Sequence, residues 1–197
     1  MKYFNNNLVR KCNFMDIRIA SDVTFDSIVD GPGLRAVVWT QGCKHNCIGC
    51  HNPQTHSLMG GKIVDTNDII EKIKSKKLQS GVTLSGGEPF LQPDAVGEIA
   101  AAVKEMGMNV WSFTGFKFEQ LIDKKNKNYF SNIRLLNNID VLVDGKFEID
   151  KKDISLKFRG SANQRIIDVK KSLKSGKVVI REEYTEDYVD TFLPMAK

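Results

Sequence analysis

The middle of this 197-residue chain alternates between segments typical of buried strands and segments typical of amphipathic helices. The expected strands are short and rich in β-branched or aromatic residues: 35–40, 81–85, 109–113 and 139–143, with weaker candidates at 165–169 and 178–180. The expected helices carry apolar residues at helical spacing: 66–77, 93–106 and 118–124. Such alternation predicts an α/β fold with a parallel sheet, whether open or closed into a barrel.

Unusual short sequences directly follow four of these expected strands. They are a cysteine-rich loop, Ser85-Gly-Gly-Glu-Pro89, Thr114-Gly-Phe116 and Asp144-Gly-Lys146. Because the carboxyl ends of parallel strands meet at one edge of a sheet, functional loops gather there. The four sequences therefore predict a single active site at that edge.

The cysteine-rich loop holds three of the four cysteines of the chain, Cys43, Cys47 and Cys50. A closed tetrahedral metal site needs four ligands, and three thiolates leave one metal position open for chemistry. The spacing therefore indicates a reactive iron–sulfur cluster. The alternative is a zinc site completed by His45, His51 or Cys12, although zinc modules usually pair two Cys-x2-Cys elements and this chain has one. Both histidines are expected to be loop residues, and Cys12 to be an unliganded thiol.

The Ser-Gly-Gly-Glu-Pro sequence is typical of a backbone that approaches a ligand closely. Paired glycines after a strand leave peptide groups accessible. Glu88 is expected to accept a hydrogen bond from a ligand ammonium group. The alternative is a tight turn with a solvated glutamate.

Composition and length favour one ordinary domain with a sizeable core. Residues 1–16 are expected to be a flexible extension, and 17–197 a single domain. No apolar run is long enough to span a membrane, and the N-terminus lacks the apolar core of a signal peptide. A reducing, cytoplasmic location is therefore expected, where close-spaced cysteines bind metals rather than form disulfides. The net charge of +5 indicates a lysine-rich solvated surface, and neither nucleic acid nor membrane is expected as a partner.

The Cys-x3-Cys-x2-Cys loop followed by a Gly-Gly-Glu-Pro strand end resembles the radical S-adenosylmethionine superfamily. The resemblance implies an incomplete, TIM-like (β/α) barrel and one [4Fe–4S] cluster held by the three cysteines. It also implies S-adenosylmethionine as cosubstrate, its amino and carboxylate groups chelating the remaining iron. Reductive cleavage would then release a 5′-deoxyadenosyl radical that abstracts hydrogen. No catalytic residue beyond the cluster ligands is implied.

Further stretches make the chain similar to the activating proteins of anaerobic ribonucleoside-triphosphate reductase, from about residue 17 to 165. They are Asp30-Gly-Pro-Gly-Leu-Arg35, Trp111-Ser-Phe-Thr-Gly-Phe116, Val143-Asp-Gly-Lys-Phe147 and Arg159-Gly-Ser-Ala-Asn-Gln-Arg165. This similarity implies a glycyl-radical activase. Its substrate would be a glycine of the large reductase subunit, and its electron donor a reduced flavodoxin or similar protein. The alternative partner is another glycyl-radical enzyme, such as one like pyruvate formate-lyase.

The same resemblance implies which residues contact the cosubstrate. They are expected to be Gly49, Cys50 and His51 at the adenine, Gly86, Gly87 and Glu88 at the glycine-rich turn, and Asp144 and Lys146 near the ribose and carboxylate. Arg35 is expected to be free to pair with an anionic group. The stretches 159–161 and 163–165 either anchor the last strand or bind the partner.

Overall fold

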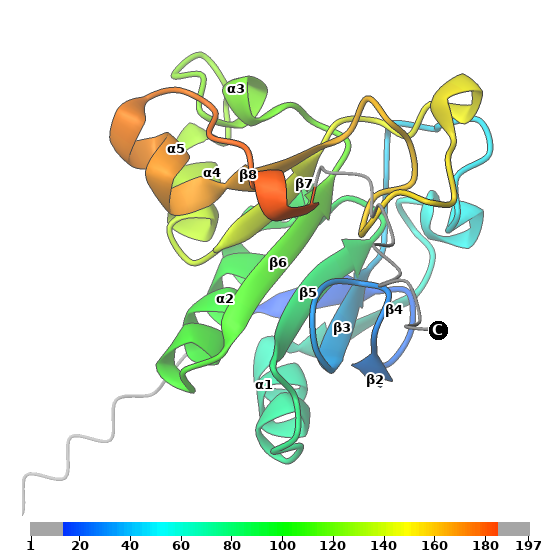
Figure 1. The fold of residues 1–197 in the computed structure, drawn as a ribbon. Coiled ribbons are helices and arrows are strands. Elements are labelled where there is room, and N and C mark those ends of the chain that lie inside the picture. Colours follow the sequence, from blue (N-terminus) through cyan, green and yellow to red (C-terminus); the bar gives the residue numbers. More distant parts are fainter. Residues whose placement is uncertain (1–13, 185–197) are drawn as a thin grey trace, which may run out of the picture.

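The computed structural model describes residues 14–184, and within this range one eight-stranded sheet organises the fold (Figure 1). Its strand order is β4-β1-β3-β5-β6-β7-β8, with β2 paired to β3. The strands are β1 (Asp16–Ile19), β2 (Thr24–Ser27), β3 (Arg35–Thr40), β4 (Lys62–Asp65), β5 (Gly81–Gly86), β6 (Asn109–Thr114), β7 (Val141–Asp144) and β8 (Arg165–Asp168). The helices are α1 (Thr66–Lys74), α2 (Pro93–Glu105), α3 (Phe118–Leu121), α4 (Tyr129–Leu136) and α5 (Val169–Ser175). Four short 3-10 turns are η1 (Pro53–Thr55), η2 (Pro89–Leu91), η3 (Ile149–Lys151) and η4 (Glu182–Tyr184).

The α/β class is as predicted, but the sheet is mixed rather than parallel throughout. Strands β3, β5, β6 and β7 run parallel, whereas β1 is antiparallel to β3 and β4. Strand β8 is antiparallel to β7. Residues 145–164 form a loop with one 3-10 turn and no crossover helix. The chain therefore starts β8 at the end where β7 stops, and antiparallel pairing follows.

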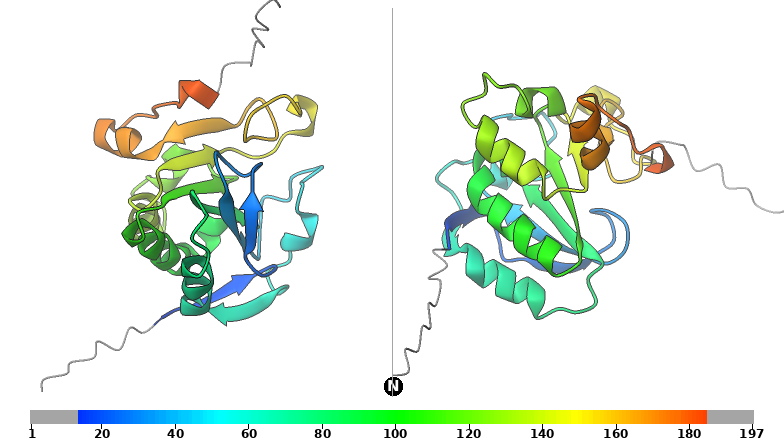
Figure 2. Two further views of the ribbon diagram at one scale, coloured as in Figure 1. Left: turned by 60° about the horizontal axis from the view of Figure 1, so that its bottom comes forward. Right: turned by 90° about the vertical axis from the view of Figure 1, so that its left-hand side faces the viewer.

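Helices α1, α2 and α4 pack against one face of the sheet (Figure 2). The buried stripe of α2 consists of Val96, Ile99, Ala100 and Val103, at the spacing of one helical face. Pro93 occupies the first turn of this helix, where its missing N–H leaves no intrahelical bond unmade. The main hydrophobic core lies between this helical layer and the sheet.

A second apolar cluster lies apart from the main core. It contains Trp111, Val141, Val143 and Ile166, with partly buried Phe113, Phe158 and Tyr184 packed against it. The Trp111 ring meets Phe158 and Tyr184 edge to face, with centroids 5.5 and 5.3 Å apart. Loop residues, rather than a long helix, therefore cover this part of the sheet.

Several boundaries differ from those expected. Helix α1 ends at Lys74, and its N-cap is Asp65 rather than the expected Thr66. The Asp65 side chain accepts a hydrogen bond from the Asn67 N–H at 2.7 Å. Helices α4 and α5 were not expected. Residues 178–180 contribute one isolated bridge, between Ile180 and Ile167, instead of a strand. The short α5 and this bridge depend on tertiary contacts, such as the pairing of Ile180 with Ile167, which local periodicity does not encode.

The N-terminal part of the described chain is already folded at Met15. Its N–H donates to Thr66 Oγ1 at 3.0 Å and its carbonyl accepts from the Thr66 N–H at 2.9 Å. Asp16 begins β1. Residues 1–13, with Cys12 and most of the expected extension, lie outside the described residues, as do 185–197. None of the helices described is long and apolar enough to cross a membrane.

Candidate functional site

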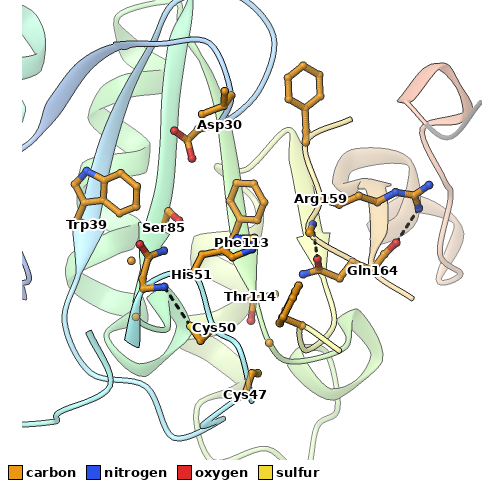
Figure 3. Close-up of a pocket in the computed structure, with 18 of the residues that line it drawn as sticks. Asp30, Trp39, Cys47, Cys50, His51, Ser85, Phe113, Thr114, Arg159 and Gln164 are labelled. Carbon is orange, nitrogen blue, oxygen red and sulfur yellow. Dashed lines mark hydrogen bonds between the residues drawn. The ribbon is translucent and has the colours of Figure 1, made fainter. Parts of the chain in front are cut away.

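A cavity of about 870 Å³ lies at the carboxyl ends of the parallel strands (Figure 3). The sequences that follow β3, β5, β6 and β7 all contribute to its lining, as the strand-end argument predicts. Those contributions are Cys43, Cys47, Cys50, His51, Ser85, Gly86, Gly87, Thr114, Gly115 and Gly145. The loop after β7 covers another side through Phe147, Phe158, Arg159, Gly160 and Gln164. The loops that follow four strands therefore border one open cavity, which residues 24–30 also line in part.

The three cysteines of the loop all line the cavity, and none of them forms a disulfide. Cys43 and Cys47 alternate with outward residues of the loop, so both thiols face the same space as Cys50. Burial raises the pKa of the Cys43 thiol, with backbone hydrogen bonds opposing that effect. A deprotonated Cys43 therefore needs a cation beside it, as a thiolate bound to a metal has.

The donor set fits an iron–sulfur cluster better than one zinc ion. Among residues 14–184, no three His, Cys, Asp or Glu side chains gather closely enough to hold a single metal ion. A zinc ion would draw each sulfur to about 2.3 Å from one centre. A cubane cluster offers a separate iron to each thiolate, so the cysteine sulfurs lie further apart than around one zinc ion. Among the nearby histidines, His45 binds Glu88 and His51 packs against Phe147 with ring centroids 5.0 Å apart, whereas the buried Nε2 of His56, which also lines the cavity, has no hydrogen-bond partner among the described residues.

The Glu88 carboxylate is the buried hub of the site, with 1% of the residue exposed. Its Oε1 accepts from the Phe90 N–H at 3.0 Å and the Thr114 hydroxyl at 2.8 Å. Its Oε2 accepts from the Gly115 N–H at 2.8 Å and lies 2.8 Å from His45 Nε2. Four partners fill the lone-pair sites of a carboxylate. Glu88 is not among the residues that line the cavity, and its four hydrogen-bond partners all belong to the protein.

His45 joins the cysteine loop to the end of β6. Its ring meets Phe116 edge to face, with centroids 4.5 Å apart and planes at 73°. A Cβ on Gly115 would lie 2.3 Å from His45 Cδ2, so only glycine fits at that position. Sequence reasoning expected His45 to be a plain loop residue. No local pattern connects positions 45, 88 and 115, which only the folded sheet brings together.

The paired glycines are needed because two backbones touch. Gly86 has φ of +97°, which side-chain-bearing residues rarely adopt. A Cβ on Gly87 would lie 2.4 Å from the Gly42 carbonyl oxygen. The Glu88 N–H donates to that same oxygen at 2.8 Å, and the Gly87 N–H donates to Thr40 O at 2.7 Å. The turn therefore supports the start of the cysteine loop while the two glycines line the cavity.

The Asp144 and Lys146 side chains do not reach the cavity, although Gly145 between them does. Asp144 is buried, accepts from the Phe118 N–H at 2.7 Å and forms a two-pronged ion pair with Arg165. This pairing, together with Glu119, raises the pKa of Arg165. Lys146 is exposed. Asp144 and Arg165 therefore tie β8 to β7, which is the anchoring role considered for residues 163–165.

Of the other residues predicted from the sequence to bind a ligand, some line the cavity and others do not. Cys50 and His51 line the cavity, whereas Gly49 lies outside it with φ of +74° and faces Ile149. Arg35 is fully buried. It donates to neutral acceptors on Thr83, Val82 and Asn109, and burial lowers its pKa to about 10. Its role in the described structure is to tie β3 to β5 and β6.

Comparisons with known proteins identify relatives of this chain. Residues 29–167 match the family described as a 4Fe-4S single cluster domain. The anaerobic ribonucleoside-triphosphate reductase-activating proteins of Salmonella typhi and Escherichia coli K12 are each 36% identical over 146 residues, which is 70% of this chain and 90% of theirs. The protein of that name from Enterobacteria phage T4 is 35% identical over 145 residues, 70% of this chain and 86% of its own. The crystal structure of QueE from Escherichia coli aligns with 51% of this chain and 53% of that chain, with a TM-score of 0.43 and 17% identity.

Proposed function

Because this chain belongs to the family of anaerobic ribonucleoside-triphosphate reductase-activating proteins, we propose that it generates a glycyl radical on the large subunit of such a reductase. The chain is a radical S-adenosylmethionine oxidoreductase of the activase class. When bound, an iron–sulfur cluster and S-adenosylmethionine supply one electron and a 5′-deoxyadenosyl radical, which takes hydrogen from a glycine.

One observation assigns this function to individual residues: three free thiols and a glycine-rich turn line the same cavity. Cys43, Cys47 and Cys50 would hold a single [4Fe–4S] cluster. Three thiolates on a four-iron cluster would leave one iron for the cosubstrate. The protein's contribution would be to fix these thiolates in a space from which the cosubstrate displaces water.

The peptide groups of Gly86 and Gly87, together with His51, are the proposed contacts of S-adenosylmethionine. Their backbone or ring atoms border the cavity beside the cysteines. Glu88 would act as a positioning residue that holds the cysteine loop and the turn at a constant separation. Asp144 would affect the site only indirectly, by positioning Gly145, which follows it directly and lines the cavity.

The remaining parts of the proposal concern the wider fold and partners. The parallel strands β3, β5, β6 and β7, with helices on one face and loops over their carboxyl ends, would form the incomplete (β/α) barrel of radical S-adenosylmethionine enzymes. A reduced flavodoxin or similar carrier would supply the electron, and the cytoplasm would be the place of reaction. The free cysteines at the site are consistent with such a reducing location.

The test is radical formation on a defined partner. The protein is reconstituted anaerobically with iron and sulfide and mixed with the large reductase subunit, S-adenosylmethionine and dithionite. Electron paramagnetic resonance should then show a glycyl-radical doublet on the reductase. A doublet on a pyruvate formate-lyase-like enzyme but not on the reductase would reassign the partner. Cosubstrate cleavage without any protein radical would contradict the activase function.

A further inference from the structure

The cysteine loop has an outer face that the cavity does not use. Lys44, Asn46 and Ile48 are exposed, and none of them lines the cavity. Ile48 is 79% exposed, so an apolar side chain on this face is available for contact with a partner. These exposed residues alternate along the loop with Cys43, His45 and Cys47, which line the cavity. The outer face therefore offers a route from solvent to the loop that does not pass through the cavity.

Exposed lysines from three segments surround this route. Lys44 precedes His45, Lys117 follows Phe116, and Lys146 follows Gly145. The neighbours of these lysines are in contact, because the His45 and Phe116 rings meet at 4.5 Å and the Gly145 N–H donates to Phe116 O at 3.1 Å. We call Lys44, Ile48, Lys117 and Lys146 the lysine surface.

The lysine surface has few direct carboxylate partners, although Glu119 interacts electrostatically with Lys117. No ion pair with a described residue involves any of its three lysines. The nearest carboxylates in sequence are engaged, Glu119 with Arg165 at 2.8 Å and Glu148 with Lys151 at 2.7 Å. Asp150 follows Ile149 on η3, and the Ile149 side chain lies near Gly49. Asp150 would therefore mark the edge of the lysine surface on that side. An acidic partner would therefore meet three ammonium groups that form no direct ion pair with the described residues, around one apolar side chain.

We propose that the lysine surface is the docking site of an acidic, one-electron carrier protein. This inference rests on the proposed function, which requires an electron while the cosubstrate and the partner's glycine occupy the cavity. The carrier is oxidised by one electron and the iron–sulfur cluster is reduced by one. No bond to the protein forms or breaks. Docking on the lysine surface leaves the cavity itself unobstructed, because none of the four residues lines it.

A charge-reversal pair tests the docking site. The variant Lys44→Glu/Lys117→Glu is compared with Lys77→Glu/Lys174→Glu, which makes the same change of formal charge at exposed lysines on α5 and after α1. Lys146 stays unchanged because it was among the expected ligand contacts. The loaded proteins are mixed with a bacterial flavodoxin hydroquinone at low salt, and cluster bleaching is followed by stopped flow. We expect the rate constant to fall about tenfold or more in the first variant only, because steering by opposite charges typically contributes 10- to 1,000-fold.

Dithionite provides the internal control, since a small reductant needs no docking surface. It should reduce the wild-type and both variants equally. A first variant that accepts electrons from flavodoxin as fast as the control pair would overturn the docking site. A wild-type protein that dithionite reduces but that cleaves no cosubstrate would contradict the proposed function and leave the comparison of reduction rates intact.

A second measurement uses the wild-type protein and so does not depend on the variants folding. Exposed lysines are acetylated with and without oxidised flavodoxin, and the modified peptides are quantified by mass spectrometry. Lys44, Lys117 and Lys146 should be protected several-fold, with Lys77 and Lys174 unchanged. Equal modification of both groups, or protection of the second group alone, would contradict the proposal.

Discussion

His45 Nε2 lies 2.8 Å from Oε2 of Glu88, so the residue between the first two cysteines is held by the carboxylate of the glycine-rich turn. The same oxygen accepts the Gly115 N–H from the end of β6. Three loops that leave three neighbouring strands therefore converge on one buried carboxylate. The geometry of the thiols depends on this polar network as well as on the cysteine spacing.

Replacing Glu88 should loosen the whole site. Glu88→Ala would leave the donors on Phe90, Thr114 and Gly115 without their acceptor inside the protein. We expect the free energy of unfolding of the cluster-free protein to fall by about 3 kcal/mol or more, because each buried unsatisfied group costs roughly 1–3 kcal/mol. Iron retained after reconstitution should fall as well. Glu88→Gln, which keeps the shape and one acceptor, should lose less, and urea titrations with iron analysis would measure both.

If Glu88→Ala had wild-type stability and iron content, and only its affinity for S-adenosylmethionine fell, then Glu88 would be a direct ligand contact. That result would restore the role expected from the sequence.

Gly115→Ala should disturb the site through His45. The new Cβ would lie 2.3 Å from His45 Cδ2, so the ring must leave Glu88. We expect lower iron retention, with partial recovery in His45→Ala/Gly115→Ala because the obstructed ring is then absent. A double-mutant cycle on unfolding free energies should give a coupling between the two sites within the usual range of about 0.5–3 kcal/mol. The matched control is Gly97→Ala on α2, whose Cβ would meet ordinary van der Waals contacts at 3.7 Å or more.

Strict additivity of the two substitutions would show that Gly115 and His45 do not constrain each other.

The cysteines should differ sharply in their importance for metal binding. Cys47→Ala should abolish the iron–sulfur chromophore and cosubstrate cleavage, because two thiolates cannot hold the cluster in place. Cys12→Ala, the control outside the described residues, should keep both. Iron, zinc and acid-labile sulfide are measured after anaerobic reconstitution. Loss of metal in Cys12→Ala, with one zinc and no sulfide in the wild-type protein, would instead support a four-ligand zinc site.

Asp140 should make the stability of the cluster-free protein depend on pH. Burial alone would raise its pKa, but hydrogen bonds from Lys104, the Val110 N–H and Lys170 outweigh burial and lower it. A carboxyl with a lowered folded-state pKa stabilises the protein fully above its unfolded pKa of about 3.9, and that stability is lost as pH falls through the folded value. Urea midpoints should therefore drop below about pH 4 in the wild-type protein.

Asp140→Asn should start from a lower midpoint at pH 6 and lose less of it on acidification. A variant with the same acid-induced loss as wild type would exclude Asp140 as its source.

The parts of the fold that sequence reasoning predicted are those encoded locally. Strands β3, β5 and β6 and helix α2 follow from short runs of apolar residues, and the shared edge follows from their parallel order. The direction of β8 was not predictable in this way. It depends on a loop, residues 145–164, whose path is set by contacts such as Gln164 with the Gly145 carbonyl at 3.0 Å.

Sequence reasoning predicted the location of the site more completely than the contacts that its residues make. The cysteines and paired glycines line the cavity because they adjoin strand ends. The orientations of Glu88 and Asp144 depend on partners far away in sequence, His45 and Arg165, and a carboxylate turns toward whichever donors the fold supplies. No pattern along the chain identifies these partners in advance.

The most direct test of the account is whether S-adenosylmethionine binds the iron that the three cysteines leave open. The reconstituted protein is reduced in the presence of cosubstrate labelled with ¹⁵N at its amino group and ¹⁷O at its carboxylate, and electron–nuclear double resonance is recorded. Both labels should couple to the reduced cluster, and Cys47→Ala should show neither signal. A reduced cluster without coupling to either label would contradict the open-iron site proposed for Cys43, Cys47 and Cys50.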